Sequence, residues 1–177
     1  MLRRPLIWIV AVAVLAVGGS FGLYWFQPWK LVTDKEVDET LSIVETGAPV
    51  ESPSVTPSAA PAVVRQGTFV THEHETTGTA RIIRNADGSH RLELVALDTS
   101  NGPDLRVWLS DQPVKKGTAG WRVFDDGTWL ELGRLKGNKG DQAYAIPAGT
   151  DLDKLGSVAI WCKRFSVSFG AAALRPA

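Results

Sequence analysis

The stretch SVAIWCKRFSVSFG, residues 157–170, contains two hydrophobic patterns that do not fit one regular strand. Val158, Ile160 and Cys162 share one parity, and the hydrophobic residues that follow the basic pair at Lys163 take the other. Because successive side chains of a strand point to opposite faces, an uninterrupted strand cannot bury both sets on one side. The stretch predicts either two strands that meet at a polar corner, which we favour, or a bulge at the basic pair.

The strand-like pattern extends back from this stretch to Gly67. Short β-branched and aromatic runs are broken by Gly, Asp and Asn about every ten residues, and helical periodicity is absent. Asp87-Gly88 is typical of a hairpin turn, and Asp126-Gly127 predicts a second hairpin whose first strand is 121–124. We therefore expect an antiparallel β-sandwich of about eight strands over residues 67–177, without a sizeable helix.

Two of the expected strands have a clear inward face. In residues 90–97 the alternation places Ala96, and the leucines two and four positions before it, on the buried side. In residues 105–110 three aliphatic side chains alternate with Arg106 and Trp108, so that these two point the other way. Both strands are therefore expected to cover the core with one face only.

The N-terminal run at residues 6–26 has no charged side chain. As a helix its 21 residues are about 31 Å long, which matches the hydrocarbon core of a bilayer. Arg3 and Arg4 precede it, and basic residues favour the cytoplasmic side. We predict a single-pass anchor in the cell membrane with a cytoplasmic N-terminus and an extracytoplasmic C-terminal domain. A cleaved signal peptide is the competing interpretation, but its apolar region is usually shorter.

The chain between anchor and β-domain changes composition twice. Residues 30–45 are charged, with apolar positions near helical spacing, and residues 46–64 are rich in Pro, Ser and Ala. The second segment cannot bury enough apolar surface to fold, so we expect a disordered tether. The predicted division is an N-terminal membrane anchor at 1–29, a juxtamembrane segment and linker at 30–66, and a β-domain at 67–177.

Composition excludes several classes of function. The 19 basic and 19 acidic side chains leave no net charge, so no nucleic-acid partner is expected. The only cysteine, Cys162, cannot form a disulfide within the chain. No C-x-x-C-H motif is present for covalent haem attachment, and no second cysteine is present to complete an iron–sulfur site. Gly18 and Gly22 form a G-x-x-x-G pattern, which is a hint of helix pairing in the membrane.

Five motifs in a fixed order carry a family resemblance. They are GTF at 67–69, HETTG at 74–78, NGPDLRVWLS at 101–110, LGRLKGNKGDQAYAIP at 132–147 and SVAIWCKRFSVSFGAAAL at 157–174. Together they resemble the DM-thirteen domain family, also called the electron-transfer DM domain. The resemblance implies a small β-rich module of secreted or membrane-anchored proteins. It also implies a role for Cys162 in redox chemistry, as a bare thiol or as a ligand to a prosthetic group such as haem.

Cys162 has two interpretations from the residues alone. A cysteine among Ile160, Trp161 and Phe165 is typically an inert hydrophobe, because cysteine is among the most buried residue types. Against this, the neighbouring basic pair at Lys163 could lower the pKa of the thiol and make it reactive. We therefore name Cys162 as the candidate redox thiol or cofactor ligand, and both interpretations remain open.

His72 and His74 are the candidate cofactor-binding histidines. On a strand their spacing of two would place both imidazoles on one face, where a histidine and cysteine together suit zinc, copper or haem iron. Only His74 matches the H-x-x-x-G motif of the family, and exposed residues at a strand end explain the pair equally well. The cofactor therefore stays unknown, with haem or another metal compatible but not required.

Two functions follow from these observations. The first is a membrane-anchored, extracytoplasmic electron-transfer domain that uses Cys162 and an unidentified envelope or redox partner, with the bilayer contacted through residues 6–26. The second is a non-catalytic binding module held on the tether, with Cys162 as core filler. In that case Trp108, Trp121 and Trp129 are candidates for an exposed recognition patch. The sequence does not decide whether the chain is an enzyme.

Overall fold

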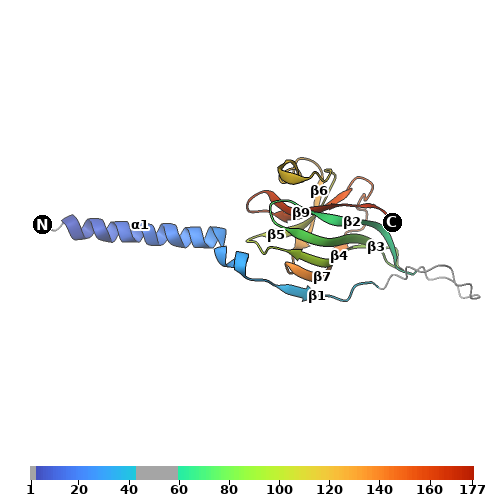
Figure 1. The fold of residues 1–177 in the computed structure, drawn as a ribbon, viewed down its shortest axis with the longest axis horizontal. Coiled ribbons are helices and arrows are strands. Elements are labelled where there is room, and N and C mark those ends of the chain that lie inside the picture. The colour runs from blue at the N-terminus through green and yellow to red at the C-terminus, as the bar shows by residue number, and fades with distance from the viewer. Residues whose placement is uncertain (1–2, 43–59) are drawn as a thin grey trace, which may run out of the picture.

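The computed structural model describes residues 3–42 and 60–177. A single long helix, α1 (Arg3–Phe26), extends away from a β-domain, and a short 3₁₀ helix, Pro28–Val32, joins the two (Figure 1). Within α1, residues Pro5–Phe26 are long and apolar enough to cross a membrane, and none of the most apolar stretch is buried against the rest of the protein. The helix predicted at the N-terminus is therefore present, with its sides exposed.

The rest of the described chain is almost entirely β-structure. A second 3₁₀ helix, Gly117–Gly120, is its only helical segment. The strands are β1 (Glu36–Asp38), β2 (Ala62–Thr71), β3 (Thr76–Arg84), β4 (His90–Thr99), β5 (Leu105–Ser110), β6 (Trp129–Arg134), β7 (Lys139–Ile146), β8 (Ser157–Cys162), β9 (Val167–Ala173) and β10 (Arg175–Pro176). Strands β3 to β9 lie where strands were expected from the sequence, while β1, β10 and the part of β2 before Gly67 were not predicted.

The predicted two-sheet antiparallel sandwich is wrong in its topology. All ten strands form one curled mixed sheet in the order β1-β7-β4-β3-β2-β9-β8-β5-β6, with β10 beside β2. The two halves are continuous because β2 pairs with β3 along Ala62–Thr68 and then with β9 from Phe69 onward. At Gly67 a side chain would collide with the backbone of Ala173, so only glycine permits this crossing. The pair β1/β7 is parallel.

The curled sheet encloses the main hydrophobic core. All three aliphatic residues of β5 belong to this core, whereas Trp108 packs on the opposite side of the sheet, as the alternation predicted. A second, smaller cluster lies there under the loop 111–128 and consists of Trp108, Phe124, Ala159, Trp161 and Ala171. The predicted strand at 121–124 does not exist, because these residues belong to the loop that covers this outer cluster. The second predicted hairpin is therefore absent, and β6 pairs with β5 instead.

The hairpin at Asp87-Gly88 is confirmed, since β3 and β4 pair on either side of it. Its second strand departs from the predicted alternation near its end. Ala96 has a positive φ of 47° and is exposed, and the pairing of β4 with β7 shifts between Leu94 and Leu97. This bulge brings Leu97 into the core in place of Ala96.

The segment 33–42, which we call the docked segment, lies on the β-domain rather than apart from it. Its strand β1 pairs with β7 at the edge of the sheet, and the helix that its spacing allowed is absent (Figure 1). Glu39 accepts hydrogen bonds from Lys136, at 2.7 Å, and from the backbone of Ala143, at 2.9 Å. The backbone N–H of Ser42 donates to the buried Glu93 at 2.8 Å. Residues 43–59, which include most of the tether predicted at 46–64, lie outside the described residues.

The segment between α1 and β2 does not simply hold the β-domain away from the helix, as a tether would. The docked segment precedes the Pro-rich linker, and β2 follows it, so both flanking pieces belong to the same sheet. Only residues 27–35 connect α1 to β1. Helix α1 is therefore connected to the β-domain by a short segment.

Candidate functional site

Cys162 is the last residue of β8, where the strand meets the polar corner predicted from the sequence. It pairs with Leu105 on one side and with Val167 on the other. Residues 163–166 form a turn, closed by a 3.2 Å hydrogen bond from the Phe165 N–H to the Cys162 carbonyl. The turn reverses the parity, so that hydrophobic residues before and after it enter the same core. The corner is therefore confirmed, and a register shift between Ile160 and Trp161 adds a bulge as well.

The thiol of Cys162 is completely buried in the main core. Burial raises the pKa of the Cys162 thiol, and hydrogen bonding from the backbone of Phe165, Asp104 and Arg164 offsets only part of this. The expected lowering by the basic pair does not occur, because Lys163 and Arg164 bind other partners. The sulfur is therefore a protonated thiol at neutral pH, shielded from solvent reagents.

His72 is a buried structural residue. Its Nδ1 lies 2.9 Å from the hydroxyl of Ser168, and its Nε2 lies 3.0 Å from the carbonyl of Lys115. Because a carbonyl only accepts, Nε2 carries the proton. The ring also stacks on Phe124 of the outer cluster. Both ring nitrogens are engaged, so His72 has no free nitrogen for a metal.

His74 lies on the other side, against the main core. Its ring centroid is 3.9 Å from that of Phe169, and Nε2 is 3.9 Å from a carboxylate oxygen of Glu73. Burial lowers the pKa of His74, and the charge of Glu73 opposes the shift without cancelling it. The strand β2 ends at Thr71, so the prediction that His72 and His74 share a face of a strand is wrong.

The residues present do not fit a metal held by several protein ligands. In residues 3–42 and 60–177, no three His, Cys, Asp or Glu side chains come together as a metal-binding group. A haem ligated by Cys162 would need its iron against the sulfur, where core side chains such as Leu105 and Val167 are packed. The structure therefore favours Cys162 as a bare thiol over Cys162 as a ligand.

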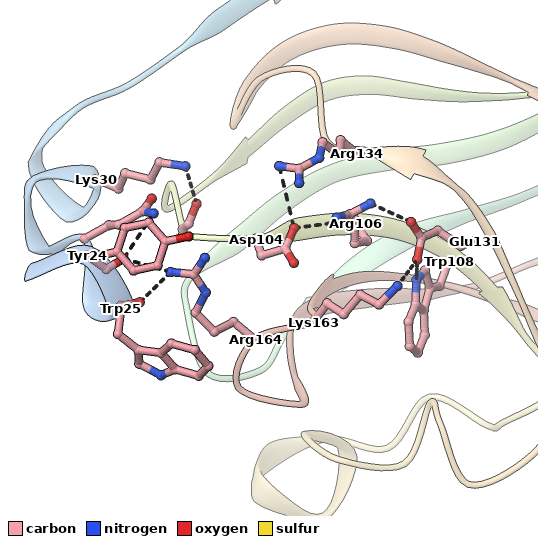
Figure 2. A network of polar contacts seen from close by, with 12 residues as sticks. Tyr24, Trp25, Lys30, Asp104, Arg106, Trp108, Glu131, Arg134, Lys163 and Arg164 are labelled. Carbon is pink, nitrogen blue, oxygen red and sulfur yellow. Dashed lines mark hydrogen bonds and ion pairs between the residues drawn. The ribbon is translucent and has the colours of Figure 1, made fainter. Parts of the chain in front are cut away.

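Arg164 joins the corner after Cys162 to the end of α1. Its guanidinium donates hydrogen bonds to the carbonyl oxygens of Tyr24, at 3.1 Å, and Trp25, at 2.6 Å, and lies over both aromatic rings (Figure 2). The last carbonyls of a helix have no intrahelical partners and carry its negative dipole end, so a cation is stabilised there. Beside this contact, Phe165 stacks on Phe26 with ring centroids 5.7 Å apart. We call this set of contacts the clamp.

A mainly apolar cavity of about 220 Å³ lies between the clamp and the β-domain. Its walls include Phe26 and Leu31 from the anchor side and His74, Phe165 and Phe169 from the domain. Lys30, which also lines it, donates a 3.1 Å hydrogen bond to the carbonyl of Gly102. The end of α1, the segment after it and the β-domain therefore line one common cavity.

A charged network extends from the same corner across the outer face. Arg106 bridges Asp104, at 2.8 Å, and Glu131, at 2.7 Å (Figure 2). The other oxygen of Glu131 accepts from Lys163, at 3.1 Å, and from the indole N–H of Trp108, at 3.3 Å. Partial burial alone would raise the pKa of Glu131, but Lys163, Arg106 and Trp108 together hold it below its usual range. Glu131 is therefore an ionised carboxylate in contact with an indole.

The predicted tryptophan patch is only partly present. Trp108 is buried, Trp121 is half-buried in contact with the main core, and Trp129 is exposed. No local pattern indicates the clamp, because Arg164 and Tyr24 are 140 positions apart. The basic pair after the cysteine was the only signal in the sequence, and it was interpreted as acting on the sulfur.

Comparison with known proteins gives one result. The family described as "Electron transfer DM13" matches residues 68–174, which run from the last four residues of β2 to beyond the end of β9 and include Cys162. No curated protein and no solved structure shows a significant match to the chain.

Proposed function

The chain belongs to the electron transfer DM13 family, and from this membership we propose that it is a membrane-anchored electron-transfer module on the extracytoplasmic side of a membrane. The observation that carries the proposal is the clamp, in which Arg164 binds the last carbonyls of α1 two residues after Cys162. If α1 spans the bilayer, the clamp places the cysteine end of the β-domain at the membrane surface. A redox partner in the same membrane then approaches this end.

The orientation follows from the charges beside the apolar helix. Arg3 and Arg4 precede it, and juxtamembrane basic residues favour the cytoplasmic side. Tyr24, Trp25 and Trp29 lie at its other end, where aromatic side chains suit the membrane–water interface. This orientation supports placing the β-domain outside the cytoplasm.

The redox group that we propose is the sulfur of Cys162. Oxidation of the thiol removes one electron and one proton and leaves a thiyl radical. The electron passes to a one-electron acceptor of the partner, such as a haem or flavin centre, and the proton passes to solvent when the turn at 163–166 opens. Return of one electron and one proton restores the thiol. Burial protects the sulfur from oxidation by peroxide and from exchange with other thiols, because these reagents must touch it. Electron transfer does not require such contact.

The test compares the full-length protein in detergent with its Cys162→Ala variant. Both are given ferricyanide, a one-electron oxidant, and the electrons delivered per chain are counted from the loss of its absorbance. We expect delivery by the wild type that the variant lacks, with the oxidised sulfur identified by mass spectrometry. Equal delivery by the two proteins would overturn the role of Cys162. An absorption spectrum and a metal analysis of both proteins show whether a cofactor contributes.

The second candidate is a non-catalytic interaction module with Cys162 as core filler. Complete burial of the thiol and its raised pKa favour this function. It predicts that Cys162→Ala changes stability alone and leaves binding of an envelope partner intact. Failure of electron delivery in both proteins would support it.

A further inference from the structure

Three tryptophans form a continuous stack on the outer face of the sheet. The rings of Trp129 and Trp108 are almost parallel, at 4°, with centroids 4.0 Å apart. The rings of Trp108 and Trp161 are 5.0 Å apart at 24°. Trp129 is 40% exposed, whereas Trp108 and Trp161 are 3% and 1% exposed. The stack therefore leads from the surface into the interior.

The strand order places these side chains together. Strands β6, β5 and β8 are neighbours in the sheet. Trp108 lies opposite Glu131 on β6 and Ala159 on β8, so that Trp129 and Trp161 are its diagonal neighbours on either side. The loop 111–128 covers the inner part of the stack, where Phe124 meets Trp161 edge to face with centroids 6.4 Å apart. The stack is thus fixed by the sheet and kept dry by the loop.

We propose that Trp129, Trp108 and Trp161 are an electron relay between the protein surface and the strand that carries Cys162, an inference that rests on the proposed electron-transfer function. Indole is among the most easily oxidised side chains, and electron transfer between rings in contact is fast because its rate falls steeply with distance. The relay begins at the exposed ring of Trp129 and ends at the residue before Cys162.

Glu131 gives the relay a group that can accept a proton. The indole N–H of Trp108 donates to its carboxylate at 3.3 Å, and Arg106 and Lys163 keep that carboxylate ionised. An external one-electron oxidant removes one electron from the stack, and the hole reaches Trp108. The resulting indole cation radical passes its Nε1 proton to Glu131, which leaves a neutral indole radical and a carboxylic acid. One electron from a donor, with the proton returned from Glu131, restores both groups.

A buried indole N–H needs an acceptor in any fold, but a neutral carbonyl, amide or hydroxyl oxygen would serve for that. The acceptor of Trp108 is a carboxylate, which can also take up the proton. Aromatic pairs stabilise a fold through area and ring geometry, and phenylalanine supplies both. At the exposed end of the stack, part of the Trp129 ring lies in water, where an external redox partner can contact it. A relay needs a contact point at the surface, a buried conductor and a proton acceptor. The stack and Glu131 together supply all three.

The experiment uses the full-length protein in detergent with a photogenerated ruthenium(III) polypyridyl complex as the oxidant. Transient absorption follows the formation of tryptophan radicals in the wild type and in single variants. Trp108→Phe should remove most of the neutral indole radical, and Trp129→Phe, at an exposed site that leaves the fold intact, should slow its appearance. Trp121→Phe is the matched control, because Trp121 is half-buried and lies outside the stack.

Glu131→Gln tests the proton step. A glutamine cannot take the proton, so the radical in this variant should persist as the cation, whose absorption differs from that of the neutral radical. The relay is refuted if Trp108→Phe and Trp121→Phe lower the radical yield equally, or if Glu131→Gln leaves the neutral radical unchanged. The same measurement on Cys162→Ala should still give the Trp108 radical, so that failure of the thiol as redox group is read separately from failure of the relay.

Discussion

Alkylation of Cys162 in the folded full-length chain should be at least about a thousandfold slower than in the unfolded chain. The thiol has no exposed surface and belongs to the main core. A reagent reaches it only when the turn at 163–166 leaves its partners. Because this is the only cysteine, modification of the whole protein reports this site alone.

The magnitude follows from the hydrogen-bond donors that hold the turn. They are the backbone N–H of Lys163 to Asp104, the backbone N–H of Phe165 to Cys162, the guanidinium of Arg122 to the Phe165 and Ser166 carbonyls, and the guanidinium of Arg164 to α1. At about 1 kcal/mol net for each donor, opening costs about 4 kcal/mol, or a factor of about a thousand. The raised pKa of the thiol slows the reaction further.

Iodoacetamide labelling, followed by intact mass at neutral pH with and without urea, measures the ratio. Arg164→Ala should speed labelling of the folded protein about fivefold, because it removes one of the four donors that hold the turn, worth about 1 kcal/mol. Arg175→Ala is the control, since it removes an arginine from the exposed terminal strand β10 and should change little. Labelling of the folded wild type as fast as that of the unfolded chain would refute the reasoning and show an accessible thiolate.

Three further predictions concern the stability of the fold. Glu93→Gln should lower the free energy of unfolding in urea by about 3 kcal/mol, because the buried carboxylate pairs with two arginines, whereas exposed Glu75→Gln should stay within about 0.5 kcal/mol. The pKa values of Glu93 and Glu131 are lowered in the fold, so both ionised carboxylates stabilise it above the unfolded-state pKa. The free energy of unfolding should therefore fall as the pH drops from about 5 toward 3. The fall should be less steep in Glu93→Gln. Gly140→Ala should cost about 1–3 kcal/mol and speed amide exchange in β1, because φ is +94° and the added carbon would meet the Val37 carbonyl.

Local patterns predicted the parts of the fold that depend on neighbouring residues. The hairpin at Asp87-Gly88 and the alternation in β5 follow from turn chemistry and side-chain period, and both are confirmed. The bulge at Ala96 was missed, because alanine gives no signal for a positive φ. The strand at 121–124 was wrong because its aromatic residues are buried by a covering loop instead of by pairing.

Long-range contacts explain what the sequence could not predict. Glu36 of β1 pairs with Lys139, more than a hundred positions away, and three residues have too little pattern to mark an edge strand. The single continuous sheet likewise depends on β2 changing partners from β3 to β9. Which strand pairs with which depends on the strand edges that distant parts of the chain present, and local composition does not indicate this.

The polar corner after Cys162 was predicted correctly, but the partners of its two basic residues were not. Parity placed the turn after Cys162, because two hydrophobic sets had to enter one core. The direction of the basic side chains could not be read, since the groups they bind, Glu131 and the end of α1, come from other elements. The same limit hid the stack, whose three rings come from three strands.

The corner at the end of β8 connects three features through successive residues. Cys162 places its sulfur in the main core, Lys163 binds the carboxylate that accepts the Trp108 indole N–H, and Arg164 binds the end of α1. Since these positions are consecutive, the burial of the sulfur, the ion pair with Glu131 and the contact with α1 all depend on the same short stretch of backbone. The polar corner therefore does more than reverse the chain, because it also binds Glu131 and the end of α1.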